Sequence, residues 1–156
     1  YGTFVYDHTV KVFCLLYLPN NSSRVIPHQC NSIDIFPTIT EIAGISLDER
    51  CENILGKSLF RLIDGTENND RESFIETGGL EGPWPSPKKH NVFCIRNNGK
   101  KLIYNDTPKT WEFYDLIKDP QETVNIYDES SEEISRFRNR LLHYFDILGI
   151  KTELAK

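Results

Sequence analysis

The segment SIDIFPTITEIAG, from Ser32 to Gly44, constrains the fold more than any other part of the chain. Pro37 suits the first position of a helix, where its missing N–H costs nothing and its fixed φ is already helical. Gly44 supplies the positive φ that often ends a helix. Apolar residues recur in the segment at close to helical spacing: Ile35, Phe36, Ile39 and Ile42. The segment therefore predicts a short amphipathic helix that must bury this stripe against another element.

The upstream run Val10–Leu18 is the predicted element against which the stripe packs. Its continuous β-branched and aromatic composition is typical of a strand buried on both faces, as in a parallel sheet covered by helices. Downstream, Leu55–Ile63 predicts one or two helical turns, and Ser73–Thr77 predicts a second short strand. We therefore expect residues 1–78 to form the end of an α/β core, with a strand, the proline-started helix, a short helix and a strand.

Residues 79–90 are rich in Gly and Pro and predict a long loop, a feature that is more often functional than idle in a compact domain. Three segments after the loop have the composition of short strands: Val92–Arg96, Lys101–Tyr104 and Trp111–Asp115. Asn97–Gly99 has the residues of a hairpin turn between the first two strands. These segments predict an antiparallel meander.

The last part of the chain predicts a long helix. Ser130–Glu133 has the pattern of a helix cap, and the apolar residues after it keep to one face as far as about Leu148. This face is expected to cover the meander. Residues 91–156 are thus a predicted antiparallel subdomain with a long C-terminal helix.

Charge and hydropathy exclude two classes of partner. The net charge of −5 argues against nucleic-acid binding, which needs a cationic surface. No apolar run approaches the roughly 20 residues that a membrane-spanning helix needs. The chain also contains no methionine, which favours its being a piece of a longer polypeptide.

The four cysteines, Cys14, Cys30, Cys51 and Cys94, lack the C-x-x-C spacing of metal sites. Free thiols are favoured because Cys14 and Cys94 lie within apolar runs, and disulfides remain an alternative. The cytoplasm is the favoured compartment. Secretion also stays open, and there the sequons at Asn20, Asn21 and Asn105 would matter.

Four parts of the chain occur in the order found in a known family. They are YDHTVKVF at 6–13, SIDIFPTITEIAG at 32–44, GKSL at 56–59, and RNNGKKLIYN at 96–105 with EFYDL at 112–116 and DPQETVN at 119–125. Together they resemble the C-terminal third of the sulfatase family, in the alkaline-phosphatase-like superfamily. Phe13 departs from the family's proline and Lys11 from its arginine. The resemblance implies an α/β fold: part of a mainly parallel sheet with helices, then a small antiparallel sheet under a long C-terminal helix.

The resemblance also implies an activity for the parent protein. A sulfatase hydrolyses a sulfate ester at a divalent cation, normally calcium, with a formylglycine nucleophile made from the cysteine of a C-x-P-x-R segment. Such a cation neutralises sulfate oxygens and orients the nucleophile. None of the four cysteines here is followed by proline two residues on, and the family's acidic metal-ligand segments are absent. Asp7-His8-Thr9 falls at a variable position of the family, so no ligand role is carried over to it.

We therefore expect no catalytic residue, metal ligand or cofactor in this chain, which alone should be inactive. Its expected partners are the missing N-terminal part of the polypeptide and a small-molecule or sugar ester. Seven residues are candidates to lie near the substrate: Thr3, His8, Glu76, Thr77, Trp84, Lys88 and His90. Thr3 stands near the place where the family has a basic residue. Glu76 and Thr77 lead into the long loop that carries the last three.

Structural roles compete with some of these assignments. His8 beside an apolar segment is more often a structural histidine, and Lys88 is more often part of a solvated turn. Arg96 and Lys101 are expected to pair across strands with Glu112 or Asp115.

Two alternatives to a sulfatase stay open, a phosphate- or phosphonate-ester hydrolase of the same superfamily and a non-catalytic structural or binding module. If the chain is a piece of a longer protein, the faces and edges of Val10–Leu18 should be exposed.

Overall fold

The computed structural model describes residues 4–19, 22–47, 54–77, 92–106, 108–152 and 154. The chain forms two compact units. Residues 1–15 and 73–156 make the sheet unit, and residues 16–72 make the helical unit. Each unit is described by itself. The boundaries predicted from the sequence near residues 78 and 91 stay a prediction.

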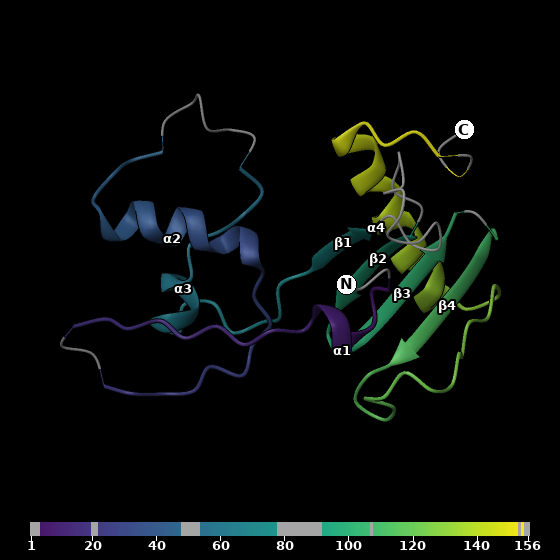
Figure 1. The fold of residues 1–156 in the computed structure, drawn as a ribbon, viewed down its shortest axis with the longest axis horizontal. Helices are drawn as coiled ribbons and strands as arrows, with labels where there is room; N and C mark the ends of the chain where they lie inside the picture. Colours follow the sequence, from purple (N-terminus) through teal and green to yellow (C-terminus); the bar gives the residue numbers. More distant parts are fainter. Residues whose placement is uncertain are drawn as a thin grey trace, which may run out of the picture. The chain divides into compact units, whose positions relative to one another are not determined.

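The sheet unit is built on four antiparallel strands in the order β1-β2-β3-β4 (Figure 1). The strands are β1 (Ser73–Thr77), β2 (Val92–Asn97), β3 (Lys100–Asn105) and β4 (Thr110–Asp115). The predicted meander is confirmed, and its first turn has Asn98 and Gly99 at φ of 48° and 70°. The meander gains one strand, because β1 pairs with β2 rather than continuing a parallel sheet.

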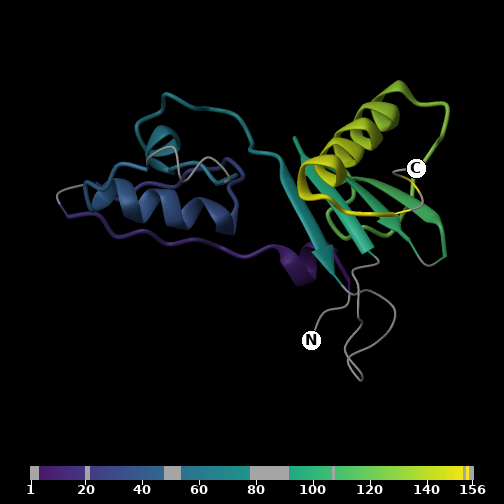
Figure 2. The same ribbon diagram turned by 90° about the horizontal axis from the view of Figure 1, so that it is seen from above.

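One face of the sheet packs against helix α4 (Glu132–Leu148), as Figure 2 shows. Ser131 caps the helix by accepting a hydrogen bond from the Ile134 amide, and Gly149 ends it at a φ of 65°. The buried side chains of this core come from strands β2, β3 and β4 and from helix α4: Phe93, Ile95, Leu102, Tyr104, Phe113, Ile134, Leu141 and Phe145. The predicted long covering helix is therefore confirmed.

Residues 4–10 cover part of the opposite face. Val5 is buried there, and helix α1 (Asp7–Val10) follows it. They pack on a second core formed by side chains of the sheet and the loop after it: Val92, Cys94, Ile103, Tyr114 and Leu116. Burial raises the pKa of the Cys94 thiol to about 12.

The helical unit contains η1 (Ser32–Asp34), α2 (Ile35–Ile42) and α3 (Phe60–Ile63). Its centre is an ion pair between Arg71 Nη1 and Asp34 Oδ2, 3.0 Å apart and almost completely buried. Asp34 Oδ1 also accepts a hydrogen bond from the Lys57 amide at 2.8 Å. Thr38 Oγ1 accepts another from the Leu59 amide at 2.9 Å. The two segments SIDIFPT and GKSL are thus joined by hydrogen bonds from polar side chains of the first to backbone amides of the second.

The helix predicted over this segment is present, but its expected burial is wrong. Pro37, Thr38 and Thr40 are buried, whereas the apolar stripe lies outward. The reason is that buried polar groups need hydrogen-bond partners, and the partners of Asp34 and Thr38 lie on the inner side of the unit. Pro37 lies in the third helical position rather than in the predicted first one. Its missing N–H is not required in the third position either, because the first four amides of a helix have no partner within the helix.

The strand predicted over Val10–Leu18 is also wrong. Val10 ends α1, and residues 11–18 have no regular secondary structure. Val12, Phe13 and Leu15 are 81%, 91% and 88% exposed. A strand needs a neighbour for its backbone hydrogen bonds, and in the described ranges the four paired strands form one sheet that does not include this segment. The side chains are exposed as expected, but the expected unpaired strand edge is absent from the described residues 11–18. No helix in the described part of the chain is long and apolar enough to cross a membrane.

Candidate functional site

A buried lysine is the centre of the candidate site. Lys101 lies on β3 next to apolar neighbours, and the period of the strand points its side chain to the face covered by residues 4–10. Its Nζ lies 2.5 Å from Asp7 Oδ1, 2.7 Å from Glu122 Oε1 and 3.1 Å from the carbonyl oxygen of Val5. The side chain has no exposed surface. An ammonium removed from water in this way requires such oxygen partners.

Asp7 connects this lysine to a second cation. Its carboxylate accepts hydrogen bonds from Arg96 Nε at 3.2 Å and Nη2 at 3.1 Å. Burial by itself would raise the pKa of Asp7, but the hydrogen bonds from Lys101 and Arg96 outweigh it and hold that pKa below its ordinary value. The Asp7 amide donates to Glu122 Oε2 at 2.5 Å. We call Asp7, Arg96, Lys101 and Glu122 the charge cluster, which contains two cations and two carboxylates.

The loop DPQETVN explains how Glu122 reaches the cluster. Asp119 accepts hydrogen bonds from the amides of Thr123 and Val124 at 2.8 and 2.9 Å, which fixes the turn. Glu122 itself has a φ of 55°. The Asn125 side chain then accepts from the Phe113 amide and donates to the Trp111 carbonyl along the edge of β4. The loop is therefore fastened to β4 on one side and to residues 5–7 on the other.

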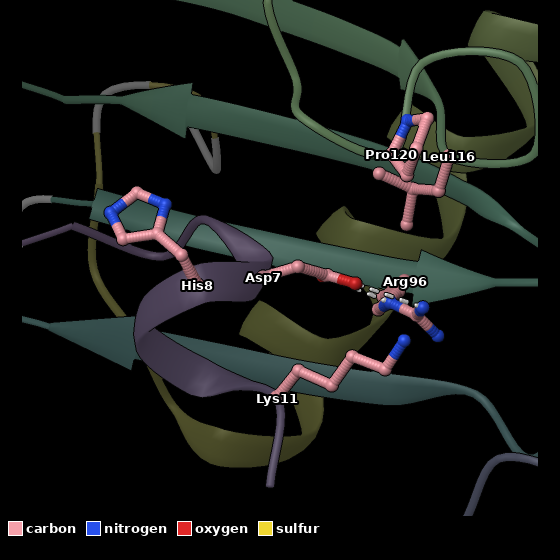
Figure 3. Close-up of a pocket in the computed structure, with 6 residues that line it drawn as sticks. All are labelled: Asp7, His8, Lys11, Arg96, Leu116 and Pro120. Carbon is pink, nitrogen blue, oxygen red and sulfur yellow. Dashed lines mark hydrogen bonds and ion pairs between the residues drawn. The ribbon is translucent and has the colours of Figure 1, made fainter.

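A pocket of about 300 Å³ opens beside the cluster. It is lined by Asp7, His8, Lys11, Arg96, Leu116 and Pro120. In Figure 3, Lys11 reaches from α1 toward Arg96, while the imidazole of His8 points away from the Asp7 carboxylate. Asp7 is already bound by Lys101 and Arg96, so Lys11 leaves the lining with a surplus positive charge. The pocket therefore has the electrostatic character that attracts an anion.

A second polar group fixes the same segment to the sheet. The Glu112 carboxylate accepts hydrogen bonds from Tyr6 at 2.8 Å, Tyr114 at 2.6 Å and Asn105 at 2.8 Å. Burial, followed by the hydrogen bond to Glu112, raises the pKa of Tyr6 to about 12 and also raises the pKa of Tyr114. The rings of Phe4 and His8 each stack against the ring of Tyr6, with a centroid separation of 5.9 Å in both pairs. Residues 4–8 are thus held by a charged and an aromatic set of contacts.

The structure places only part of the predicted site. His8 lines the pocket, and Glu76 and Thr77 lie at the end of β1, opposite Phe93 and Val92. Thr3, Trp84, Lys88 and His90 lie outside the described residues. The substrate-proximal roles of all seven stay predictions.

The predicted cross-strand ion pairs are wrong for Arg96 and Lys101, whose carboxylate partners here are Asp7 and, for Lys101, Glu122. It is the neighbouring Lys100 that pairs with Asp115, at 2.7 Å. The role of Glu122 was missed, although one signal was present. Alternation along β3 puts Lys101 on the same face as Ile103, and a lysine on an apolar face needs a carboxylate from elsewhere in the chain.

The described residues do not provide a metal site. Within these ranges no three His, Cys, Asp or Glu side chains are grouped so that they could hold a metal ion. The charge cluster has two carboxylates, and both are occupied by cations of the protein. The site can fix a chain segment and attract an anion.

The architecture defines a fold that is found in part of solved sulfatase structures. A structure of BT4656 in complex with its substrate D-glucosamine-2-N,6-O-disulfate has a TM-score of 0.59 at 21% identity, over 74% of this chain and 24% of that one. A structure of BT1596, a 2-O GAG sulfatase, has a TM-score of 0.56 at 22% identity, over 77% of this chain and 26% of that one. At these identities the likeness shows the fold.

The sequence comparison gives the family. Residues 2–145 match the profile of N-sulphoglucosamine sulphohydrolase, C-terminal, and the chain belongs to this family. Arylsulfatase K of Rattus norvegicus is 29% identical over 141 residues, which are 85% of this chain and 24% of that protein. An arylsulfatase of Chlamydomonas reinhardtii is 29% identical over 140 residues, 76% of this chain and 21% of that protein. The chain therefore spans about a quarter of the length of these relatives.

Proposed function

We propose that this chain is the C-terminal part of a sulfatase-like hydrolase that cleaves sulfate esters, with its reaction centre in the preceding part of the polypeptide. The observation that carries the proposal is the family match over residues 2–145, joined by arylsulfatase relatives. The formylglycine nucleophile and a divalent cation, calcium by family resemblance, belong in this proposal to that preceding part. The described residues contain no group that could hold the cation, and none of the four cysteines of this chain is followed by proline two residues on, so no step is assigned to them.

The part played by this chain is to hold residues 4–10. The charge cluster binds the carbonyl of Val5, the amide of Asp7 and the Asp7 side chain. These three contacts on Val5 and Asp7 leave the backbone of this segment little freedom. In the sequence, Thr3 comes directly before this segment, and the resemblance puts Thr3 near the substrate.

The anionic group of the substrate fits the charge of the pocket. Lys11 and Arg96 both line it, and only Arg96 is neutralised by Asp7. A surplus cation near a substrate entrance raises the local concentration of an anion such as a sulfate ester. This supports an anionic substrate in general, and the ester type is decided by the experiment below.

The test is an assay of the whole polypeptide in which this chain is encoded. We expect release of sulfate from an aryl sulfate such as 4-nitrocatechol sulfate, and mass spectrometry should find a cysteine converted to formylglycine outside residues 1–156. The control is the chain of residues 1–156 alone, which should release none. Turnover of an aryl phosphate or phosphonate in place of the sulfate would support the alternative hydrolase. No turnover of any of the three esters would support a non-catalytic module.

A further inference from the structure

Helix α2 has two faces that are used differently. Its inner face is buried and polar, with Thr38 bound to the Leu59 amide and Thr40 bound to the Pro37 carbonyl. Asp34, at the start of the helix, is bound to Lys57 and Arg71. The contacts to Leu59, Lys57 and Arg71 lie within the helical unit and outside the helix, so they fix the rotation of the helix about its own axis.

The other face of α2 is apolar and lies in solvent. Its side chains are 46%, 55%, 57% and 51% exposed at Ile35, Phe36, Ile39 and Ile42. The one charged residue of the helix, Glu41, lies off this stripe. Single apolar side chains at a surface are ordinary, but four exposed apolar side chains along one side of a helix mark an interaction surface.

We propose that the outward stripe of α2 binds an apolar face in the preceding part of the same polypeptide. The occupant follows from two observations. The relatives are about four times as long as the region that this chain matches, and the matching family profile is that of a C-terminal part. The inference rests on the proposed function only for the existence of that preceding part.

The chemistry of the stripe defines the surface that it takes. Four aliphatic or aromatic side chains offer no charge and no hydrogen-bond donor, so the partner surface is apolar and dry at its centre. An eight-residue helix is roughly 12 Å long, which suits packing across the face of a sheet or along a helix. Because the inner contacts of α2 already fix its rotation, the stripe is presented without rearrangement of the helical unit.

The test measures protection of the stripe in the whole, unaltered polypeptide by hydroxyl-radical footprinting with mass spectrometry. Each oxidation rate is divided by the intrinsic reactivity of its side chain and by its exposed fraction in this structure. On this scale we expect Phe36 and Ile39 to be oxidised at least five-fold more slowly than Val25, a 93% exposed reference in the same unit. The buried Leu62 serves as the protected reference. Oxidation of Phe36 and Ile39 at the rate of Val25 would overturn the inference.

Two variants give an independent measurement on the same polypeptide. Ile39→Asp should lower its thermal midpoint by several degrees or leave it insoluble, because the aspartate would be buried without a partner. Glu41→Lys, a larger charge change on the same helix but off the stripe, should leave the midpoint unchanged. Equal midpoints for both variants would contradict the inference.

The alternative partner for the stripe of α2 is a second copy of the protein. Footprinting at a protein concentration at which sedimentation finds only monomer decides this case. Protection that persists in the monomer supports the intramolecular partner, and protection that is lost there overturns it. The sulfatase assay is independent. Activity with an unprotected stripe would defeat this inference alone, and a protected stripe without ester turnover would defeat only the proposed function.

Discussion

The ammonium of Lys101 lies 2.7 Å from a carboxylate oxygen of Glu122, and 0% and 2% of the two side chains are exposed. Lys101 belongs to a central strand of the sheet, and Glu122 belongs to the loop that follows β4. The same lysine also holds Asp7 of α1. One buried cation therefore connects three segments that are distant in the sequence.

Removing this cation should be costly. Lys101→Met leaves the buried Glu122 and the partly buried Asp7 without their shared cation, and we expect a loss of about 3–5 kcal/mol in the free energy of unfolding. Lys100→Met is the matched control, because Lys100 makes a single, partly exposed ion pair with Asp115. Its loss should be at most about 1 kcal/mol. Urea denaturation followed by circular dichroism measures both values. Equal losses would show that the cluster does not carry this stability.

Asp7 should make stability depend on acid pH. Its pKa is below the ordinary value of 3.8 in the folded state because hydrogen bonds from Lys101 and Arg96 outweigh the effect of burial. A lowered carboxyl pKa contributes stability that is complete above the unfolded-state value and is lost as pH falls through the folded-state value. The difference in unfolding free energy between wild type and Asp7→Asn should thus be constant above about pH 5 and shrink below about pH 4. Asp128→Asn is the control. Hydrogen bonds from Ser130 also lower the pKa of Asp128, but this carboxylate lies at an exposed turn where water screens its charge, so its pH-dependent difference should be smaller. A difference for Asp7→Asn that stays constant down to pH 2 would contradict this account.

The packing of α4 on the sheet gives a further prediction. Leu141 is fully buried against the sheet, whereas Leu148, on the same helix, is 44% exposed. Leu141→Ala should lower the free energy of unfolding by about 2–5 kcal/mol, through lost burial and the cavity left behind. Leu148→Ala should change it by no more than about 0.5 kcal/mol. Thermal and urea unfolding of the two variants provide the comparison. Similar losses would show that α4 does not pack on the sheet through the face that contains Leu141.

Local patterns predicted the sheet unit well. Period-two alternation and the turn at Asn98 and Gly99 are properties of neighbouring residues, and β2, β3 and β4 depend mainly on pairing between neighbours in the chain. Helix α4 likewise follows from its cap at Ser131 and a stripe that the adjacent sheet can bury. The position of α2 was predicted for the same reason.

What depends on distant partners was not predicted. The apolar stripe of α2 indicates that the helix has an interface. Which side of α2 is buried within the helical unit depends instead on the ion pair between Asp34 and Arg71, which lie far apart in the sequence. Val10–Leu18 has the composition of a strand, yet composition cannot supply the neighbouring strand that its backbone requires. The ion pair of Glu122 was not predicted. Its partner Lys101 was expected to pair with a carboxylate on a neighbouring strand, as a cation on a strand usually does.

The last prediction concerns the joint between the segments SIDIFPT and GKSL. A Cβ at Gly56 would lie 2.1 Å from the carbonyl oxygen of Ile33, and this oxygen belongs to backbone that cannot turn aside. Gly56→Ala should therefore separate the two segments and destabilise the protein by about 1–3 kcal/mol or more. Gly65→Ala is the control, since a Cβ there meets no atom within 4 Å and only the φ of +82° opposes it. Its cost should be about 1 kcal/mol. Hydrogen exchange should then show faster opening of η1 and α2 in Gly56→Ala with the sheet unit unchanged. If the two alanine variants unfold alike, the close approach at Ile33 does not govern the joint.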